Sequence, residues 1–539
     1  MDQFDYVVVG GGTAAGILTY RLGAAGKSVC VLEAGPPDDK LLMRMPAGFI
    51  KTLFDPNVTW QFKSDPMPAT NNREIQYTQG KTLGGSSTVN GMVYNRGQAA
   101  DFNSWAQRGN RGWGYDDVLQ YFRRTERRVG DADTRYRGQD GRLVTAVSPW
   151  PNQVVDGFIA AAQSRGHPFN PDYNGVNQAG VGFYQSAIKR GRRISTATAF
   201  LHPARRQFGV DVRTKAVATS VILVNKRAAG VAYVQDGVTH QVRARAAVIV
   251  SAGTVNSPKL LQLSGIGPAE LLQACGIDVK HELPGVGENF RDHFSPRIVV
   301  RAREGVDTLN AHVSGIPLAI EAARWMLRRP GVLSLSPALV HVFGKSEQAL
   351  DESDYSLVFT PGSYKQGFIG RLDSFPGMTC GAWQMRPDSS GSIRIRSADP
   401  HDAPRVNANY LAVENDRRVL VRALREARAI LQAPALAPFV DHEIFPGPDV
   451  QTDEDWLSFA RAQGNSSYHL VGSCKMGPAT DPLAVVDDRL RVHGLDGLHI
   501  VDASIMPTMP SANTYASTMM IAEKASDMIL EDCRALQTA

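Results

Sequence analysis

The sequence predicts an α/β protein with more than one domain. Residues 4–35 have the pattern of a strand, a helix and a second strand, the unit from which parallel sheets are built. Strand-like runs return far along the chain, at 210–252 and again at 498–504. Residues 391–400 instead alternate between apolar and polar side chains, as a half-buried strand does. The length of 539 residues is sufficient for about two to four domains.

The first predicted unit can be justified element by element. Residues 5–9 (DYVVV) are a short, β-branched run that suits a buried parallel strand. Residues 13–26 combine helical spacing with good helix formers, and residues 28–35 supply a second buried strand. We therefore expect the helix to connect two parallel neighbours of one sheet.

The glycines between the first strand and the helix predict a dinucleotide site. Gly10 permits a tight turn, Gly12 lets the backbone approach a pyrophosphate, and Ala15 is small enough for close helix–strand packing. The helix N-terminus offers free N–H groups to phosphate. Glu33, about 20 residues further on, can accept hydrogen bonds from ribose hydroxyls. A plain turn without a ligand is the alternative, and this unit alone does not distinguish NAD from FAD.

Charge and cysteine content exclude several classes of protein. The 58 Lys and Arg nearly balance the 53 Asp and Glu, so no nucleic-acid partner is predicted. The five cysteines form no cluster with zinc spacing, so we expect a reduced protein without a metal site. The first residues resemble a strand rather than a leader, and no apolar run approaches the roughly 20 residues of a membrane span. A cytoplasmic protein with no transmembrane segment is predicted.

Two further glycine-rich stretches, residues 80–97 and 253–267, do not repeat the first motif. On physical grounds alone, each fits a structural loop. The second also contains an ordinary helix pattern, with Ser257 as the cap and Pro258 in the first turn.

Taken together, these two stretches resemble the signature patterns of the glucose–methanol–choline (GMC) oxidoreductases. The resemblance continues through residues 283–293 (LPGVGENFRDH) and 498–529, in the order in which the family has them. Residues 301–460 show little that aligns. The resemblance implies an FAD-dependent enzyme that acts on small-molecule alcohols and passes electrons to O₂ or another acceptor.

The implied fold is a Rossmann-like FAD-binding domain of discontinuous segments, with an α+β substrate-binding cap domain that contains an antiparallel sheet. We assign residues 1–155, 190–300 and 461–539 to the FAD-binding domain and residues 156–189 and 301–460 to the cap. Within the cap, residues 318–331 predict an amphipathic helix with a basic end. It either lies on the cap as an ordinary surface helix or touches a membrane surface.

The cofactor-binding residues come from the first glycine motif and from the resemblance. They are Gly10, Gly12, Thr13, Ala14, Ala15, Glu33, Ala34, Gly84, Gly85, Ser86, Asn90, Gly91, Met92, Val93, Val217, Asp502, Ala503, Asn513 and Thr514. Some relatives attach the flavin through a histidine where this chain has Val89, so non-covalent FAD is expected. A buried Asp502 beside a phosphate would need backbone or hydroxyl donors to stabilise its charge.

The resemblance also assigns the catalytic pair. His469, in HLVGSCKMG, matches the histidine that precedes a Gly-Thr-Cys motif in the family, with Ser473 in place of the usual Thr. Asn513 matches a second polar residue about 45 positions later, and both side chains are expected over the flavin ring. A neutral imidazole, with an ordinary pKa of about 6.5, can take the hydroxyl proton while flavin N5 takes the hydride. Asn513 can only orient the oxygen.

Other interpretations of these residues remain at this stage. A lone histidine between apolar neighbours is more often a core residue, and Tyr468 is either a wall of the substrate pocket or a core aromatic. Cys474 lacks the partners of a nucleophile, and His293 is expected to be structural. A metal at His469 is excluded because no second ligand has suitable spacing.

Substrate choice is the least determined prediction. The sequence around His469 lacks the acidic cluster that would indicate a cationic alcohol. We therefore expect an uncharged primary alcohol as the substrate, with an aromatic alcohol as one option. Trp383, Met385 and Phe359 are candidate pocket residues because they are bulky and lie in the cap segment. The same base would also serve a flavin-containing lyase of the hydroxynitrile lyase type, which is the alternative function, and a non-catalytic flavin-binding protein is a third.

Overall fold

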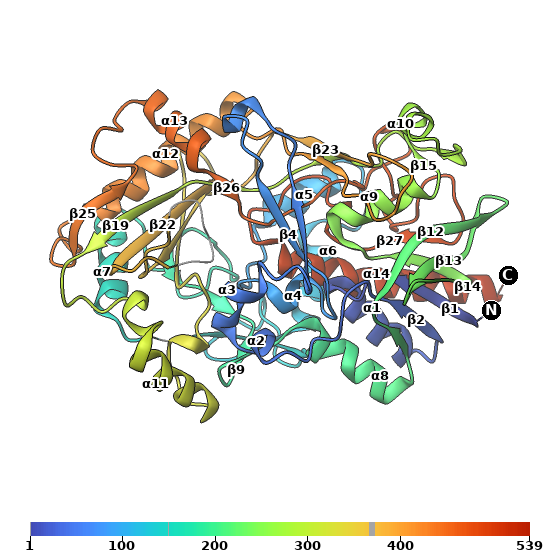
Figure 1. Ribbon diagram of the computed structural model, residues 1–539, viewed down its shortest axis with the longest axis horizontal. Helices are drawn as coiled ribbons and strands as arrows, with labels where there is room; N and C mark the ends of the chain where they lie inside the picture. The colour runs from blue at the N-terminus through green and yellow to red at the C-terminus, as the bar shows by residue number, and fades with distance from the viewer. Residues whose placement is uncertain (1, 149, 366–371, 539) are drawn as a thin grey trace.

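The computed structural model describes residues 2–148, 150–365 and 372–538. Figure 1 shows two lobes, with both chain ends in the lobe that contains β1 and β14. The other lobe contains β19, β22 and the helices α7 and α12. The chain crosses between the lobes several times, so each is assembled from segments that are far apart in sequence.

The first lobe is organised around a seven-stranded sheet. Its order is β11-β2-β1-β14-β13-β12, with β27 paired to β14. These strands are β1 Asp2–Val9, β2 Val29–Leu32, β11 Asp211–Arg213, β12 Ala216–Val224, β13 Arg227–Gln235, β14 Val238–Val250 and β27 Leu498–Ile500. β1 runs parallel to β2 and β14, and β14 runs parallel to β27. The segments at 4–35, 210–252 and 498–504 therefore meet in one sheet, as the sequence predicts.

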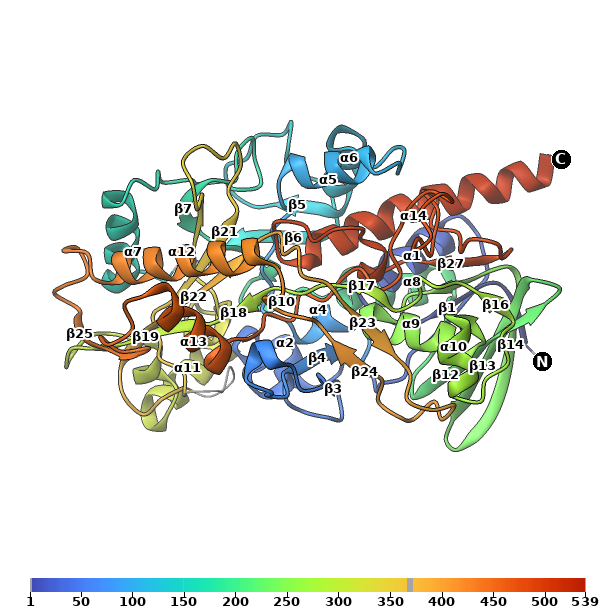
Figure 2. The ribbon, with the colours of Figure 1, turned by 90° about the horizontal axis from the view of Figure 1, so that it is seen from above.

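Helices from both ends of the chain pack together beside this sheet. α1 (Thr13–Ala24) connects β1 to β2 and packs against the C-terminal α14 (Thr514–Thr538), where Arg21 contacts Glu523 and Asp527. Figure 2 shows α14 running along the lobe beside α1. Further helices of the chain are α4 Ser86–Val89, α5 Ala99–Gln107, α6 Tyr115–Thr125, α8 His202–Phe208, α9 Gly253–Leu263, α10 Ala269–Ala274 and α13 Asp453–Gln463.

The second lobe is built on a six-stranded antiparallel sheet, which confirms the predicted cap architecture. Its order is β25-β19-β22-β21-β20-β7. These strands are β7 Gly180–Phe183, β19 Arg297–Ala302, β20 Val340–Gly344, β21 Tyr355–Thr360, β22 Gly377–Gln384 and β25 Val440–Phe445. α7 (Gln153–Ser164) and α12 (Glu414–Leu431) pack side by side on one face. The opposite face is turned toward the first lobe.

One sequence-based expectation about local structure is confirmed and one is wrong. Residues 391–400 do form a strand, β23 (Gly391–Arg394), but it pairs with β17 (Glu288–Phe290) and β24 (Arg405–Asn407) in a separate sheet rather than in the cap sheet. The helix that we expected to begin at a Ser257 cap begins at Gly253 instead.

Pro258 consequently lies inside α9, where a proline cannot donate to the carbonyl four residues earlier. That carbonyl, on Thr254, accepts a hydrogen bond from the Ser473 hydroxyl. Ser257 donates to Asp502 instead of capping the helix. Long-range hydroxyl contacts thus replace the local capping that the sequence suggests.

The predicted amphipathic helix forms as α11 (Gly315–Met326) on the outside of the cap (Figure 1). Trp325 and Glu321 face inward, and the Trp325 indole donates to the carbonyl of Gly191. Ile316 and Met326 are largely exposed, at 78% and 72%. The outer face of α11 is therefore more apolar than that of an ordinary surface helix.

Candidate active site

A long cavity lies between the two sheets and is lined by residues of both lobes. Its walls include every predicted cofactor residue except Ala15 and Gly84, and they also include His469 and Tyr468. Ala15 is fully buried, in keeping with a packing role, and the Gly84 N–H donates to the carbonyl of Gly11 at 2.7 Å. These two residues shape the loops behind the wall.

The end of the cavity beside β1 has the geometry of a phosphate site. Gly10 has a φ of +95°, and a methyl group there would lie 2.4 Å from the Ser251 carbonyl oxygen. Gly12 immediately precedes α1 with an extended backbone, so the N-terminus of α1 faces the cavity through Thr13 and Ala14. Free N–H groups at this position suit a pyrophosphate.

Glu33 and Asp502 are the acids among the described residues that line the cavity. The Glu33 carboxylate accepts hydrogen bonds from the N–H groups of Gly11 and Gly35, at 2.7 and 2.8 Å. Burial raises its pKa to about 7, although both N–H groups oppose this shift. Each oxygen keeps a lone pair that a ribose hydroxyl can use.

Asp502 has the donors that a buried carboxylate requires. One oxygen accepts from the Gly253 N–H and the Ser257 hydroxyl, and the other accepts from the Ser504 N–H, at 2.6–2.9 Å. These three contacts satisfy the requirement stated from the sequence. Asp502 therefore holds the start of α9 against the chain after β27 rather than remaining an unpaired charge near phosphate.

Asn90 is held so that its amide group can serve a ligand. Its Oδ1 accepts from the Met92 N–H and from Arg193 Nη1, at 2.9 and 2.8 Å. The amide NH₂ is left without a partner among the described residues, and Asn90 lines the cavity. Val89 lines it too, so an apolar side chain stands where some relatives carry the histidine that attaches flavin.

The predicted catalytic pair converges in the middle of the cavity. Asn513 Nδ2 lies 2.8 Å from His469 Nε2, and His469 Nδ1 lies 2.9 Å from His293 Nδ1. His293 Nε2 lies 2.7 Å from the carbonyl oxygen of Met385. The four residues form one chain of hydrogen bonds from the residue after β22 to the residue before α14.

The carbonyl at one end of this chain determines the tautomers. A carbonyl oxygen only accepts, so His293 carries its proton on Nε2 and its Nδ1 is an acceptor. His469 then donates from Nδ1, which leaves a lone pair on Nε2. That lone pair accepts the Asn513 amide and is the atom of His469 that can take a proton.

Both imidazoles are held in the neutral form. Burial lowers the pKa of His293 to about 4, with the Met385 carbonyl opposing the shift. Burial, and then repulsion from His293, lowers the pKa of His469 well below its ordinary value. His469 is therefore an unprotonated base at neutral pH.

A buried carboxylate fixes the backbone that carries His469. Asp292 accepts from the His469 N–H at 2.8 Å and from the hydroxyls of Ser466 and Tyr410. Tyr468, between Ser466 and His469, has a φ of +61°, a conformation that a non-glycine residue holds only when its surroundings enforce it. The turn is thus over-determined by its contacts.

Asp292 and His293 contact His469, and the sequence analysis did not predict these contacts. His293 was expected to be structural, yet its Nδ1 holds His469 in the reactive tautomer. Both residues end the segment 283–293 that carries part of the resemblance. An adjacent Asp-His pair in that segment was the available signal.

The cap contributes the remaining wall. Of the three bulky residues proposed from sequence, only Trp383 lines the cavity, with its ring centre 5.8 Å from that of His469. Phe359 stacks on Phe158 at 3.9 Å in the core of the cap, and Met385 contributes its carbonyl rather than its side chain. Among the described residues there is no group of His, Cys, Asp and Glu that could hold a metal ion.

These features are those of a dinucleotide-dependent oxidoreductase, and similarity to known proteins identifies the family. Residues 4–295 and 387–522 match the two family models described as GMC oxidoreductase. The chain therefore belongs to the GMC oxidoreductase family, and FAD is its cofactor. The predictions of the family, of FAD and of an oxidoreductase that acts on alcohols are confirmed.

Individual relatives extend over nearly the whole chain. A Photobacterium profundum protein named oxygen-dependent choline dehydrogenase is 37% identical over 530 residues, covering 98% of this chain and 93% of its own. A Staphylococcus aureus (strain MSSA476) protein of the same name is 37% identical over 538 residues, with the same coverage.

Solved structures share the fold. Pyridoxine 4-oxidase from Mesorbium loti has a TM-score of 0.87 and 27% identity, covering 97% of this chain and 98% of that one. Formate oxidase has a TM-score of 0.92 at 22% identity, covering 99% of each chain. None of the helices formed by the described residues has the length and apolar character that a bilayer span requires.

Proposed function

We propose that the protein oxidises a primary alcohol to the aldehyde, with His469 as the base. The observation that carries this proposal is the convergence of His469 Nε2 and Asn513 Nδ2 at 2.8 Å on the cavity wall. An alcohol hydroxyl that replaces this hydrogen bond would donate to the His469 lone pair and accept from the Asn513 amide. Both contacts are needed to align an alcohol for proton and hydride loss.

The alcohol is oxidised by two electrons. Its hydroxyl proton moves to His469 Nε2, and FAD, when bound, would supply the acceptor for the hydride that leaves the carbon. Asn513 donates to the developing alkoxide oxygen but has no group that can take the proton. Burial keeps His469 neutral before the reaction, so Nε2 does not have to lose a proton before it can act as the base.

We also propose that FAD is held non-covalently. Val89 has no nucleophilic atom, and the Asn90 amide supplies a hydrogen-bond donor next to it. Gly10, Gly12 and the start of α1 would hold the pyrophosphate, and Glu33 the ribose. Acid precipitation should therefore release the flavin into the supernatant.

His469→Ala tests the base. We expect about 10²- to 10⁴-fold slower bleaching of the flavin band under anaerobic conditions, with FAD still bound, because the hydroxyl proton loses its acceptor. Benzyl alcohol and 4-(hydroxymethyl)benzoate are suitable substrates. His442→Ala is the matched control, because His442 is an exposed histidine whose imidazole pairs with Asp441.

Unchanged bleaching in FAD-loaded His469→Ala would remove His469 as the base. A wild-type flavin that no alcohol bleaches would instead reject alcohol oxidation and favour a non-redox reaction. Admitting air afterwards separates an oxidase from a dehydrogenase by whether the colour returns.

A further inference from the structure

Arg297 is a cation in the cavity that the proposed reaction does not use. It opens β19 and lies opposite Gly381 of β22 in the register of the cap sheet. Both residues line the cavity. A methyl group at Gly381 would lie 3.8 Å from Arg297 Nε and 3.3 Å from Ser295 Oγ, so the arginine side chain passes directly over the glycine.

Arg297 has no hydrogen bond or ion pair with any described residue. The segments outside the description contain no Asp or Glu that could supply one. Burial lowers the pKa of its guanidinium, with Tyr364 and Tyr468 opposing the shift. A guanidinium without an acceptor among the described residues is costly in such a place, because burial removes part of its hydration.

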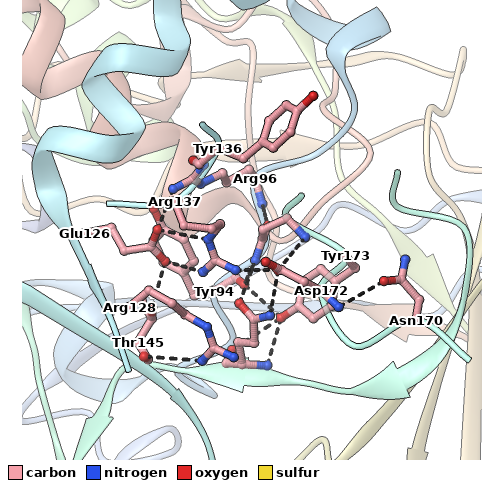
Figure 3. Close-up of polar contacts among 12 residues, drawn as sticks. Tyr94, Arg96, Glu126, Arg128, Tyr136, Arg137, Thr145, Asn170, Asp172 and Tyr173 are labelled. Carbon is pink, nitrogen blue, oxygen red and sulfur yellow. Dashed lines mark hydrogen bonds and ion pairs between the residues drawn. The ribbon is translucent and has the colours of Figure 1, made fainter. Parts of the chain in front are cut away.

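Other buried arginines of this chain do have acceptors. Arg96 and Arg137 share the carboxylate of Glu126, and Arg137 also reaches Asp172 (Figure 3). Arg193 lacks a carboxylate but donates to the Ser87 carbonyl and to Asn90 Oδ1. Arg297 differs from all of these, because the described part of the chain supplies no acceptor for it.

The carboxylates around the cavity already accept hydrogen bonds from other groups of the protein. Glu33 and Asp502 lie at the dinucleotide end and are bonded to backbone N–H groups. Asp292, behind His469, is bonded to Tyr410, Ser466 and the His469 backbone. None of these carboxylates is placed to receive a cationic substrate, whereas a guanidinium is available for an anionic one.

Arg297 and His469 lie beside two nearby residues of the same strand, β22. Gly381 and Trp383 face the cavity from the same strand, two residues apart, which corresponds to roughly 7 Å. Trp383 flanks His469, and Gly381 lies under Arg297. Arg297 and the Trp383 ring beside His469 therefore line one cavity, where the body of a substrate would lie between them.

We propose that the substrate is an alcohol that also carries a carboxylate, with the carboxylate bound by Arg297 and the hydroxyl by His469 and Asn513. A guanidinium matches a carboxylate through two parallel hydrogen bonds. Tyr468 lines the same cavity. This proposal rests on the proposed function and replaces the expected uncharged alcohol.

The first test measures binding without turnover. Benzoate and benzamide are titrated into the FAD-loaded protein, and the shift of the flavin absorption gives each Kd. We expect benzoate to bind about 10- to 100-fold more tightly than benzamide, because hydrogen bonds to a charged group are the stronger ones. Arg297→Gln should abolish this difference, and Arg301→Gln, which removes an exposed charge from the same strand, should keep it.

The second test measures turnover. 3- and 4-(hydroxymethyl)benzoate are compared with their methyl esters, which keep the ring and lose the charge. We expect at least one acid to exceed its ester about tenfold or more in kcat/KM, and Arg297→Gln to remove that preference.

Equal kinetics for acid and ester in the wild type, or a preference that survives Arg297→Gln, would overturn the proposal. Either result leaves the oxidation itself intact, since both compounds are alcohols. Tight, Arg297-dependent benzoate binding without oxidation of any alcohol would reject the proposed function instead, and with it the assignment of this anion site to an alcohol substrate.

Discussion

The buried arginines of the first lobe and the arginine of the cap cavity have opposite surroundings. Arg96 and Arg137 are almost completely buried and are neutralised by Glu126 (Figure 3), which also accepts from Thr145 and the Gly138 N–H. Arg297 faces a cavity and has no acceptor among the described residues. The charges of Arg96 and Arg137 are neutralised within the fold, whereas the charge of Arg297 is not neutralised by any described residue.

This difference separates charges that maintain the fold from charges that await a ligand. In the ion cluster around Glu126, burial alone would raise the pKa of the carboxyl, and the two arginines outweigh burial to lower it to about 2. Around Arg297, burial is opposed only by two phenols. Removing a charge should therefore destabilise the protein at Glu126 and change its specificity at Arg297.

The largest effect is expected at Glu126. Glu126→Gln leaves Arg96 and Arg137 buried without a full counter-charge, which should lower the free energy of unfolding by about 3–5 kcal/mol. Urea denaturation followed by circular dichroism measures this loss. Arg297→Gln is the comparison, and it should leave the denaturation midpoint unchanged or raised. A similar loss of stability in both variants would show that the two arginines do not differ in kind.

The next largest effect is expected in the chain of hydrogen bonds that joins His293, His469 and Asn513. His293→Leu removes the acceptor for His469 Nδ1–H, so the reactive tautomer is no longer enforced, and kcat/KM should fall by about 10- to 100-fold. His293→Gln can still accept from His469 and donate to the Met385 carbonyl, so it should recover most of the rate. Equal losses in the two variants, at equal FAD content, would count against the tautomer argument.

A smaller effect is expected from pH. The pKa of Glu126 in the folded state, about 2, lies below its unfolded value of about 4.3, so its stabilisation is complete above pH 4.3 and is lost as the pH falls toward 2. The gap in thermal midpoint between wild type and Glu126→Gln should be constant at neutral pH and should close below pH 4.3. A gap as wide at pH 2 as at neutral pH would mean that charge is not the cause.

Local sequence patterns determined much of the dinucleotide site. The β1–α1–β2 unit depends on neighbouring residues and on glycines that permit one backbone path, so its elements were predicted closely. His469 and Asn513 were placed through the resemblance, and they lie within hydrogen-bond distance. The assignment of individual residues to FAD stays a prediction.

The features that could not be predicted depend on contacts between distant segments. His293 gains its role from His469, 176 residues away, and the position of Pro258 inside α9 depends on Ser473. Arg297 begins a strand whose neighbours come from the middle of the chain, and the two family models leave 296–386 between them unmatched. No periodicity reveals which face of such a strand meets a cavity.

The most direct test of the account is the rate of anaerobic flavin bleaching by 4-(hydroxymethyl)benzoate compared with choline, at equal concentrations. Choline appears in the names of relatives at 37% identity. It is a cation, whereas 4-(hydroxymethyl)benzoate is an anion. We predict that the acid bleaches the flavin and that choline, repelled by Arg297, does so far more slowly. Faster bleaching by choline would contradict the account.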